Sequence, residues 1–152
     1  MNRRTFFLNG AGALATLAVL PALAALTPTE VHVFKNPYCG CCGAWIEHMR
    51  SAGFAVKVTE VTDSTAARKR VGVPDRFGSC HTATVGGYAL EGHVPAAEVK
   101  RLLATKPKAI GLAVPAMPPA SPGMNTPGRK DPYQVLFIDP SGREIVYASY
   151  PK

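Results

Sequence analysis

From residue 31 onward, the spacing of apolar and polar positions predicts a mixture of strands and helices. Val31–Phe34 is a short run of β-forming residues, and residues 54–61 alternate between apolar and polar with a period of two, so both are expected to be strands. Between them, residues 44–52 carry Trp, Ile and Met at helical spacing, which predicts a helix. A second helix, capped by Asp63 or Ser64, is expected to follow the second strand.

The second half of the chain is predicted to contain a hairpin, a helix, a long loop and a closing hairpin. These pieces fall at residues 82–90, after Pro95, at 113–132 and at 133–147. The first hairpin turns at Gly86-Gly87, which is a strong two-residue turn signal. The loop carries six prolines. Loops of this length are uncommon in compact domains and are often functional or disordered.

The predicted order of elements is β-α-β-α-β-β-α, followed by the Pro-rich loop and the C-terminal β-hairpin. This is an α/β order, and it is the order of the thioredoxin-like fold with a C-terminal addition. In that fold a reactive Cys-x-x-Cys lies between the first strand and its helix, where Cys39 and Cys42 stand in this chain. The segment that enters the third strand packs against it, so Cys80 is expected to approach the same place.

The first 24 residues are predicted to be an export signal and not part of the fold. Arg3-Arg4 precedes an apolar stretch over residues 10–20 that is too short to span a bilayer comfortably, and residues 22–24 offer a small-x-small cleavage pattern. The paired arginines resemble a twin-arginine signal; an ordinary secretion signal and an uncleaved anchor are the alternatives. We therefore expect a periplasmic protein with no membrane segment after cleavage, in which residues 25–152 form one domain.

Basic charge is scattered along the chain. The formal net charge is +7, and it falls to +5 when Arg3 and Arg4 leave with the predicted signal. The run Arg68-Lys69-Arg70 has no interleaved aromatic residues and is interpreted as a solvated helix face. Because the sequence contains no known nucleic-acid-binding signature, nucleic acid is not a predicted partner.

The most informative feature of the sequence is the cluster Cys39-Gly40-Cys41-Cys42 near the expected start of the first helix. A helix N-terminus stabilises a thiolate, so Cys39 is a candidate for attack on a disulfide and Cys42 for resolving the mixed product. A simple exchange enzyme has no use for Cys41, because a third neighbouring thiol offers competing disulfides. Thiols that persist in an oxidising compartment indicate redox chemistry, a soft metal, or both.

Metal binding accounts better for the third and fourth sulfurs. Thiolates select Cu(I), Zn(II) or iron–sulfur clusters over hard cations. A structural zinc site normally uses separated cysteine pairs, whereas the adjacent Cys41 and Cys42 are awkward as two ligands of one ion and suited to bridging several. Met117 and Met124 in the Pro-rich loop offer thioethers that favour Cu(I), although both can also be adaptable packing residues. Bridged Cu(I), with several ions per chain, is therefore preferred over mononuclear zinc.

The four histidines are interpreted differently from one another. His81 directly follows Cys80 and is the preferred candidate for a nitrogen ligand or a proton-handling neighbour. His93 could face the site from the end of the fourth strand. His48 is interpreted as a surface or packing residue, and His32 as a structural one.

Several motifs together resemble one known family. They are Asn36-Pro37-Tyr38-Cys39-Gly40-Cys41-Cys42-Gly43-Ala44-Trp45, His48-Met49, Gly53-Phe54, Ser79-Cys80-His81-Thr82-Ala83, Glu91-Gly92-His93-Val94-Pro95, Gly111-Leu112-Ala113-Val114-Pro115-Ala116-Met117-Pro118 and Ser121-Pro122-Gly123-Met124. With these motifs the chain resembles the small CopG-type periplasmic copper-resistance proteins over nearly all of residues 25–152. The resemblance implies a thioredoxin-like domain that binds copper in a thiolate-bridged multi-copper cluster. The ligands it implies are Cys39, Cys41, Cys42 and Cys80, with His81, Met117 and Met124 as further candidates.

Three functions remain open at this point. The first, which we prefer, is a periplasmic copper-binding protein of copper tolerance that stores Cu(I) or cycles it between Cu(I) and Cu(II). Cycling would make it a copper oxidoreductase, with periplasmic copper-handling or electron-transfer proteins as partners. The second is a thiol–disulfide oxidoreductase that works through Cys39 and Cys42. The third is a small secreted binding domain stapled by two disulfides.

Overall fold

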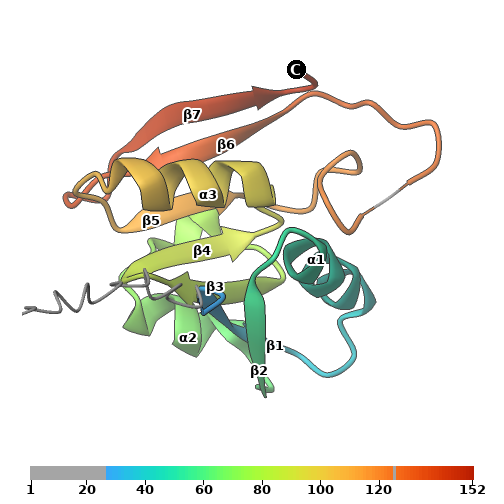
Figure 1. Ribbon diagram of the computed structural model, residues 1–152, viewed down its shortest axis with the longest axis horizontal. Coiled ribbons are helices and arrows are strands. Elements are labelled where there is room, and N and C mark those ends of the chain that lie inside the picture. Colours follow the sequence, from blue (N-terminus) through green and yellow to red (C-terminus); the bar gives the residue numbers. More distant parts are fainter. Residues whose placement is uncertain (1–26, 125) are drawn as a thin grey trace, which may run out of the picture.

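The described residues, 27–124 and 126–152 in this computed structural model, form one mixed sheet with helices on both of its faces (Figure 1). The elements in chain order are β1 (Glu30–Lys35), α1 (Gly40–Ser51), β2 (Ala55–Glu60), α2 (Ser64–Arg70), the short 3-10 helix η1 (Asp75–Phe77), β3 (His81–Val85), β4 (Tyr88–Gly92), α3 (Ala96–Thr105), β5 (Gly111–Val114), β6 (Tyr133–Ile138) and β7 (Glu144–Tyr150). The predicted α/β class is confirmed. The predicted export signal, residues 1–24, lies outside the described residues. Within the described part of the chain, no helix combines the length and the apolar character needed to cross a membrane.

The seven strands lie in the order β2-β1-β3-β4-β5-β6-β7. Strand β1 is parallel to β2 and antiparallel to β3, and β3 is antiparallel to β4. Strand β5 is parallel to β4, and β6 and β7 continue the sheet as antiparallel neighbours. The register sets Lys35 at the end of β1 opposite His81 at the start of β3. The chain that leaves β1 for α1 therefore lies at the same end of the sheet as the chain that enters β3.

Most predicted elements are present, with small differences at their ends. Both hairpins form as predicted, and Asp63 caps α2 by accepting the N–H of Thr65 at 2.8 Å. The first helix was predicted over residues 44–52 but begins earlier, at Gly40, because Cys39 is its N-cap residue. The helix start lies inside the cysteine cluster, whose short and small residues carry no helical apolar period.

The sequence prediction omits strand β5 and assigns residues 113–132 wholly to a loop. Residues 111–114 are all buried and pair with β4 on one side and β6 on the other. Gly111 approaches β4 so closely that a Cβ there would stand 1.8 Å from the carbonyl oxygen of Ala89. Such a short apolar run has no local period that separates it from a loop, so the strand depends on its long-range partners. The Pro-rich loop begins at residue 115.

Two apolar cores lie on the two faces of the sheet. Trp45 and Met49 of α1 and Leu102 of α3 belong to the larger core, and all three are fully buried. The smaller core lies on the opposite face, where Phe77 of η1 packs with Ile138 of β6. Helix α1 is thus anchored by its second and third turns, which leaves its first turn free to carry the cysteines.

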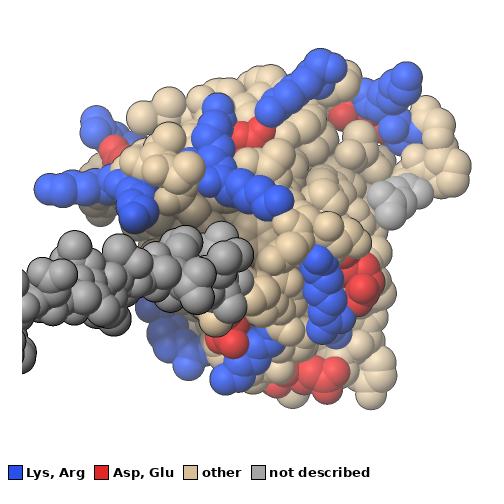
Figure 2. All heavy atoms as spheres, in the orientation of Figure 1, with Lys and Arg blue, Asp and Glu red and all other residues tan. Residues whose placement is uncertain are grey.

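The interpretation of residues 68–70 as a solvated helix face is wrong for Arg68. Its side chain is buried, and its guanidinium lies 3.3 Å from the carboxylate of Glu91 and 3.4 Å from that of Asp75. Its neighbours Lys69 and Arg70 are exposed, as predicted. Basic side chains elsewhere are spread out, with acidic groups between them, over the face drawn in Figure 2.

Two histidines hold parts of the fold together, as expected from the sequence. His48 Nε2 accepts the N–H of Ala96, the first residue of α3, at 3.0 Å. The ring of His32 shares a hydrogen bond of 2.8 Å with the hydroxyl of Thr59. His48 therefore connects the last turn of α1 to the start of α3.

Candidate metal centre

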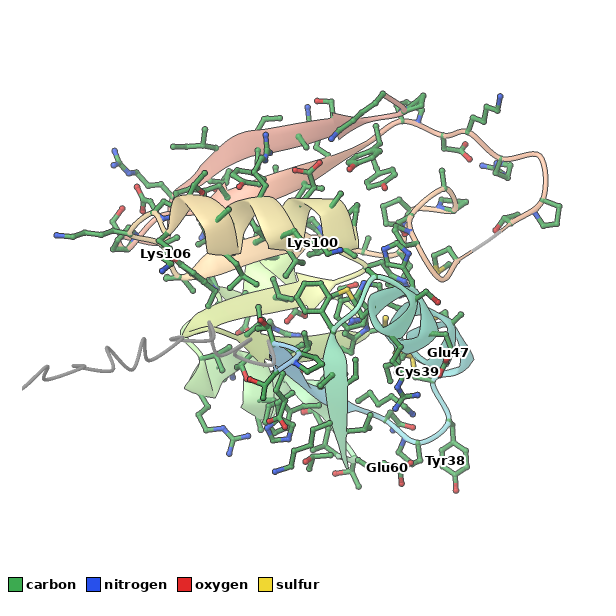
Figure 3. All side chains as sticks on the ribbon, in the orientation of Figure 1. Tyr38, Cys39, Glu47, Glu60, Lys100 and Lys106 are labelled. Atoms are coloured by element: carbon green, nitrogen blue, oxygen red, sulfur yellow. A yellow bond between two sulfur atoms is a disulfide. The ribbon has the colours of Figure 1, made fainter. Side chains whose placement is uncertain are left out.

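The loop between β1 and α1 is held by its own hydrogen bonds. Asn36 accepts the N–H of Tyr38 through its side chain at 2.9 Å and accepts the N–H of Cys39 through its carbonyl at 3.1 Å. The amide nitrogen of the Asn36 side chain donates to the carbonyl of Thr62 at 3.1 Å. These bonds place Cys39 at the start of α1, while the side chain of Tyr38 is 93% exposed and points away from the protein (Figure 3).

Four sulfur atoms meet at the amino end of α1. Cys39 and Cys42 form a disulfide, whereas Cys41 and Cys80 carry free thiols. The Sγ of Cys41 lies 3.6 Å from that of Cys39, and the Sγ of Cys80 lies 3.5 Å from that of Cys42. All four sulfurs lie within 4.8 Å of one another. The predicted approach of Cys80 to the cysteines of α1 is therefore confirmed.

Glu91 of β4 holds the chain on both sides of Cys80. Its carboxylate accepts the N–H of Ser79 at 2.7 Å and the hydroxyl hydrogen of Thr82 at 2.6 Å. The Glu91 side chain is fully buried; burial raises the pKa of its carboxyl, and these two hydrogen bonds oppose that rise. Since the bonds come from residues before and after Cys80, they position the backbone that presents this thiol to α1.

His93 presents one nitrogen to Cys80 in a defined tautomer. Its Nδ1 lies 2.6 Å from the carbonyl oxygen of Pro122, which can only accept, so Nδ1 carries the proton. Its Nε2 then holds a lone pair, and it lies 3.0 Å from Cys80 Sγ. Burial lowers the pKa of His93, which favours this neutral form. Metal-ligating histidines are commonly oriented in this way, by a carbonyl on the second nitrogen.

His81 is buried beside Trp45 and His93. Its ring centroid lies 4.4 Å from that of Trp45 and 5.2 Å from that of His93. Its Nδ1 is 3.4 Å from Cys80 Sγ, and its buried Nε2 has no hydrogen-bond partner among the described residues. Burial, followed by the neighbouring His93, lowers the pKa of His81 to about 3, so the ring is neutral. Because a buried nitrogen without a partner is costly, the ring fits a site that takes up a further group.

The Pro-rich loop lies across the first turn of α1. Gly123 has a φ of +85°, and a Cβ at this residue would stand 2.6 Å from the backbone nitrogen of Trp45 and 3.0 Å from the carbonyl oxygen of Cys41. Only glycine fits this conformation at this distance. The preceding residue, Pro122, is the one that accepts from His93. One short stretch of the loop thus contacts both the cysteine-bearing helix and the histidine that faces Cys80.

The predicted site residues are brought together to different degrees. Met124 is half-buried and directly follows the glycine that contacts α1, whereas the side chain of Met117 is 49% exposed. Both methionines stay predicted ligands, placed in the loop that crosses α1. The remaining predicted residues converge on one point: Cys39, Cys41, Cys42, Cys80 and His81.

His81 is the histidine preferred from the sequence, yet His93 makes the shorter contact with Cys80. A signal for His93 was present in the first hairpin. Its register pairs Thr82 with Glu91, and continuing it by two residues on each strand sets residue 80 opposite residue 93. A turn at Gly86-Gly87 implies this register, so the contact could have been predicted from the turn.

The donor set of the site fits a soft metal ion. The ligand atoms of Cys80, His81 and His93 form a second group within 4.8 Å of one another, which shares Cys80 with the four-sulfur group. Thiolate sulfur and imidazole nitrogen suit copper and zinc and do not suit magnesium or calcium. Because the thiolate is the ligand form of cysteine, four-sulfur binding requires Cys39 and Cys42 in their reduced state.

The chain is similar to one family of sequences and to two solved structures. A family model described as a protein of unknown function, DUF411, matches residues 77–124, which include Cys80, both site histidines and the loop on α1. A solved structure of copper resistance protein CopG in form 2 is 42% identical, covers 82% of this chain and 100% of its own, and has a TM-score of 0.78. A structure of form 1 is also 42% identical, covers 83% and 100%, and has a TM-score of 0.77. No curated protein matches the chain.

Proposed function

Since this chain belongs to the CopG family of copper resistance proteins, we propose that it binds Cu(I) in a sulfur-bridged site as part of copper tolerance. Copper is the cargo of the protein in this proposal. The observation that carries it is the convergence of four cysteine sulfurs within 4.8 Å of one another. Such a cluster is rare in a structural site and is chemically matched to a soft ion.

The position of the cysteines on α1 favours several ions over one. Cys41 and Cys42 are adjacent in the first helical turn, so their side chains diverge from the helix in different directions. Two such thiolates are poorly placed around a single tetrahedral ion. Bridging lets each sulfur be shared between neighbouring Cu(I) ions, and Cys80 contributes from the side of β3.

Other side chains are proposed to complete the site. His93 offers a lone pair on Nε2, and His81 offers a buried nitrogen without a partner. Met117 and Met124 are proposed as thioether ligands because they lie in the loop that crosses α1. Imidazole and thioether both suit copper, whereas thioether is a poor ligand for zinc.

The wider setting of the site is also a proposal. The order β2-β1-β3-β4, with β1 parallel to β2 and antiparallel to β3, supports a thioredoxin-like arrangement of the first four strands. We further propose that residues 1–24 direct export, that residues 25–152 act as one domain in the periplasm, and that copper-handling or electron-transfer proteins are the partners.

An anaerobic Cu(I) titration of the reduced chain tests the function. Thiolate-to-copper ultraviolet absorption and elemental analysis should saturate at several Cu(I) ions per chain, because bridging sulfurs share ions. Saturation at a single weakly held ion would remove the bridged site from the proposal. Saturation with zinc at equal strength in a parallel titration would remove the preference for copper.

Substitutions locate the site within the same titration. Cys41→Ser should sharply lower the number of Cu(I) ions bound, because a bridging sulfur is lost. His93→Asn should weaken binding. His32→Asn is its matched control, because the ring of His32 is hydrogen-bonded to Thr59 of β2 and lies against Phe34 of β1. Equal binding by Cys41→Ser and the unaltered chain would contradict the assignment.

Thiol–disulfide exchange is the second candidate function. The observation that favours it is the Cys39–Cys42 disulfide at the start of α1, with Cys39 only half-buried. A helix N-terminus stabilises the thiolate that such exchange requires. This function predicts exchange with a protein disulfide that survives the loss of Cys41 and Cys80; exchange that disappears with those two residues would argue against it.

A further inference from the structure

We propose that the four cysteines divide into two working pairs: Cys39 and Cys42 supply electrons that reduce Cu(II), and Cys41 and Cys80 retain the Cu(I) that is formed. This inference rests on the proposed copper function and adds an electron source to it. It assigns the chain a reaction, the reduction of cupric ion, with the dithiol of α1 as the reductant.

The two pairs are distinguished by their covalent state in the structure. Cys39 and Cys42 are joined in a disulfide, and Cys41 and Cys80 are free. A sulfur atom in a disulfide is no longer a thiolate and cannot bridge copper ions in the same way. The reduced chain therefore offers four thiolates at one point, and the oxidised chain offers two. The two thiolates that are lost on oxidation are those of Cys39 and Cys42, which the fold places within disulfide distance of each other.

The positions of the sulfurs explain why Cys39 and Cys42 form the redox pair. Their Cα atoms lie 5.4 Å apart, inside the normal range for a disulfide. Both belong to the start of one helix, so they can pair without any change in how β3 packs on α1. Cys80 is held separately by the hydrogen bonds that Ser79 and Thr82 donate to the carboxylate of Glu91.

The free pair keeps a binding site after oxidation. Cys80 Sγ has the lone-pair nitrogen of His93 at 3.0 Å, and the Pro122 carbonyl orients that nitrogen. Cys41 Sγ lies within 4.8 Å of Cys80 Sγ. Two thiolates and one imidazole form a soft donor set that favours Cu(I) over hard cations. Oxidation thus replaces a large copper site by a smaller one and does not abolish it.

The chemical step balances without any further reactant. The Cys39 and Cys42 thiols lose two protons and two electrons, and one Sγ–Sγ bond forms between them. Two Cu(II) ions each accept one of the electrons and become Cu(I). Because the oxidant is the substrate itself, the reaction runs once per reduced chain and then stops at the disulfide.

The test adds Cu(II) to the reduced, copper-free chain under anaerobic conditions. A Cu(I)-specific chelator then measures the cuprous ion formed, and alkylation with peptide mass spectrometry identifies the cysteines that are paired. The expected result is about two Cu(I) ions per chain, since the oxidation of two thiols to one disulfide releases two electrons. The disulfide should join Cys39 to Cys42, with Cys41 and Cys80 alkylated once the copper is removed. A disulfide between other cysteines, or between chains, would overturn the division into pairs.

Single substitutions test independently whether the cysteines divide into a reducing pair and a copper-retaining pair. Cys42→Ser removes the partner of Cys39 and should slow Cu(I) formation on the order of tenfold, because the remaining thiols must pair in less favourable positions. His32→Asn, whose ring is hydrogen-bonded to Thr59 and is not part of the sulfur cluster, is the control and should leave the rate unchanged. Cys41→Ser should lower the Cu(I) that stays with the chain after gel filtration. Equal rates in Cys42→Ser and His32→Asn would overturn the proposal. If Cys42→Ser fails to fold, the disulfide map of the unaltered chain decides the question alone.

The Cu(I) titration of the same reduced sample separates this inference from the proposed function. Binding of several Cu(I) ions without reduction of Cu(II) would leave the copper site standing and remove the electron source. Failure of the chain to bind Cu(I) at all would remove the proposed function, and with it the retaining role of Cys41 and Cys80.

Discussion

Replacement of Glu91 by glutamine tests whether Cys80 is held in place from β4. The Glu91 carboxylate is fully buried and accepts from Ser79 at 2.7 Å, from Thr82 at 2.6 Å and from Arg68 at 3.3 Å. A glutamine of the same shape keeps one acceptor oxygen, so one of the hydrogen bonds across Cys80 survives. Its NH₂ group replaces the other oxygen, so the hydroxyl of Thr82 must turn from donor to acceptor, and Arg68 loses its buried counter-charge.

The size of the effect follows from these contacts. Removing one partner of a buried ion pair typically costs about 3–5 kcal/mol. Arg68 keeps the carboxylate of Asp75 at 3.4 Å and the hydroxyl of Thr65 at 3.2 Å. We therefore expect a loss below that range, of about 2–3 kcal/mol of unfolding free energy. Residues that orient a metal ligand typically change metal affinity by about 10- to 100-fold. We expect a fall of this size in Cu(I) affinity, because Glu91 orients the segment that carries Cys80.

Glu98→Gln is the matched control. Glu98 is also a buried carboxylate, but it lies on α3 and accepts from Tyr150 at 2.7 Å and from Lys152 at 2.6 Å. Lys152 is largely exposed, so water can compensate for the lost charge and the cost should stay near 1 kcal/mol or below. Urea unfolding gives the stabilities, and competition with a Cu(I) chelator gives the affinities. A folded Glu91→Gln chain with unchanged Cu(I) affinity, or an equal loss in Glu98→Gln, would refute the reasoning.

Two further perturbations test the loop and a histidine away from the sulfurs. Gly123→Ala places a Cβ 2.6 Å from the backbone nitrogen of Trp45 and should weaken Cu(I) binding while the sheet stays folded. Gly128→Ala is the control, because Gly128 also has a positive φ but has open space around it. Equal effects of the two substitutions on Cu(I) affinity would contradict a role for the contact between Gly123 and α1. Burial lowers the pKa of His48 from 6.5, and its Nε2 must be unprotonated to accept the N–H of Ala96. Below pH 6.5 the unfolded chain therefore binds more protons than the folded one. The free energy of unfolding should fall as the pH drops through this range. His48→Gln should show a shallower fall in urea unfolding at several pH values, and an unchanged slope would exclude His48 as a contributor.

Elements with a strong local pattern could be predicted from the sequence, and those that depend on distant partners could not. The alternation over β2, the cap at Asp63 and the Gly86-Gly87 turn each act within a few residues, and each predicts its element correctly. Strand β5 is four residues long and is a strand because β4 and β6 flank it. The burial of Arg68 has a similar cause, since its counter-charge comes from β4 and not from its own helix.

In the candidate site, too, features that depend on nearby residues or on the order of elements could be predicted, and features that depend on distant contacts could not. The order of elements was enough to predict that Cys80 approaches the cysteines of α1, because topology places both at one end of the sheet. The pairing of Cys39 with Cys42 was one alternative among several, since four cysteines at this spacing permit more than one disulfide. The orientation of His93 could not be predicted, because it depends on a carbonyl almost thirty residues later, at Pro122.

The Pro-rich loop is therefore part of the site and not an appendage to the sheet. At its start, the hydroxyl of Ser79, one residue before Cys80, donates to the carbonyl of Ala116. Further along, Pro122 determines which nitrogen of His93 faces Cys80, and Gly123 contacts the first turn of α1. The loop thus contacts the three segments that carry the candidate ligand atoms: the start of α1, the residues that enter β3 and the residues that follow β4. Prolines suit this task because they restrict the unfolded loop and lower the entropy lost when it is ordered on the site. A shift of the loop would at once alter the tautomer of His93 and the backbone around Cys41, which is why we place the loop inside the proposed copper site.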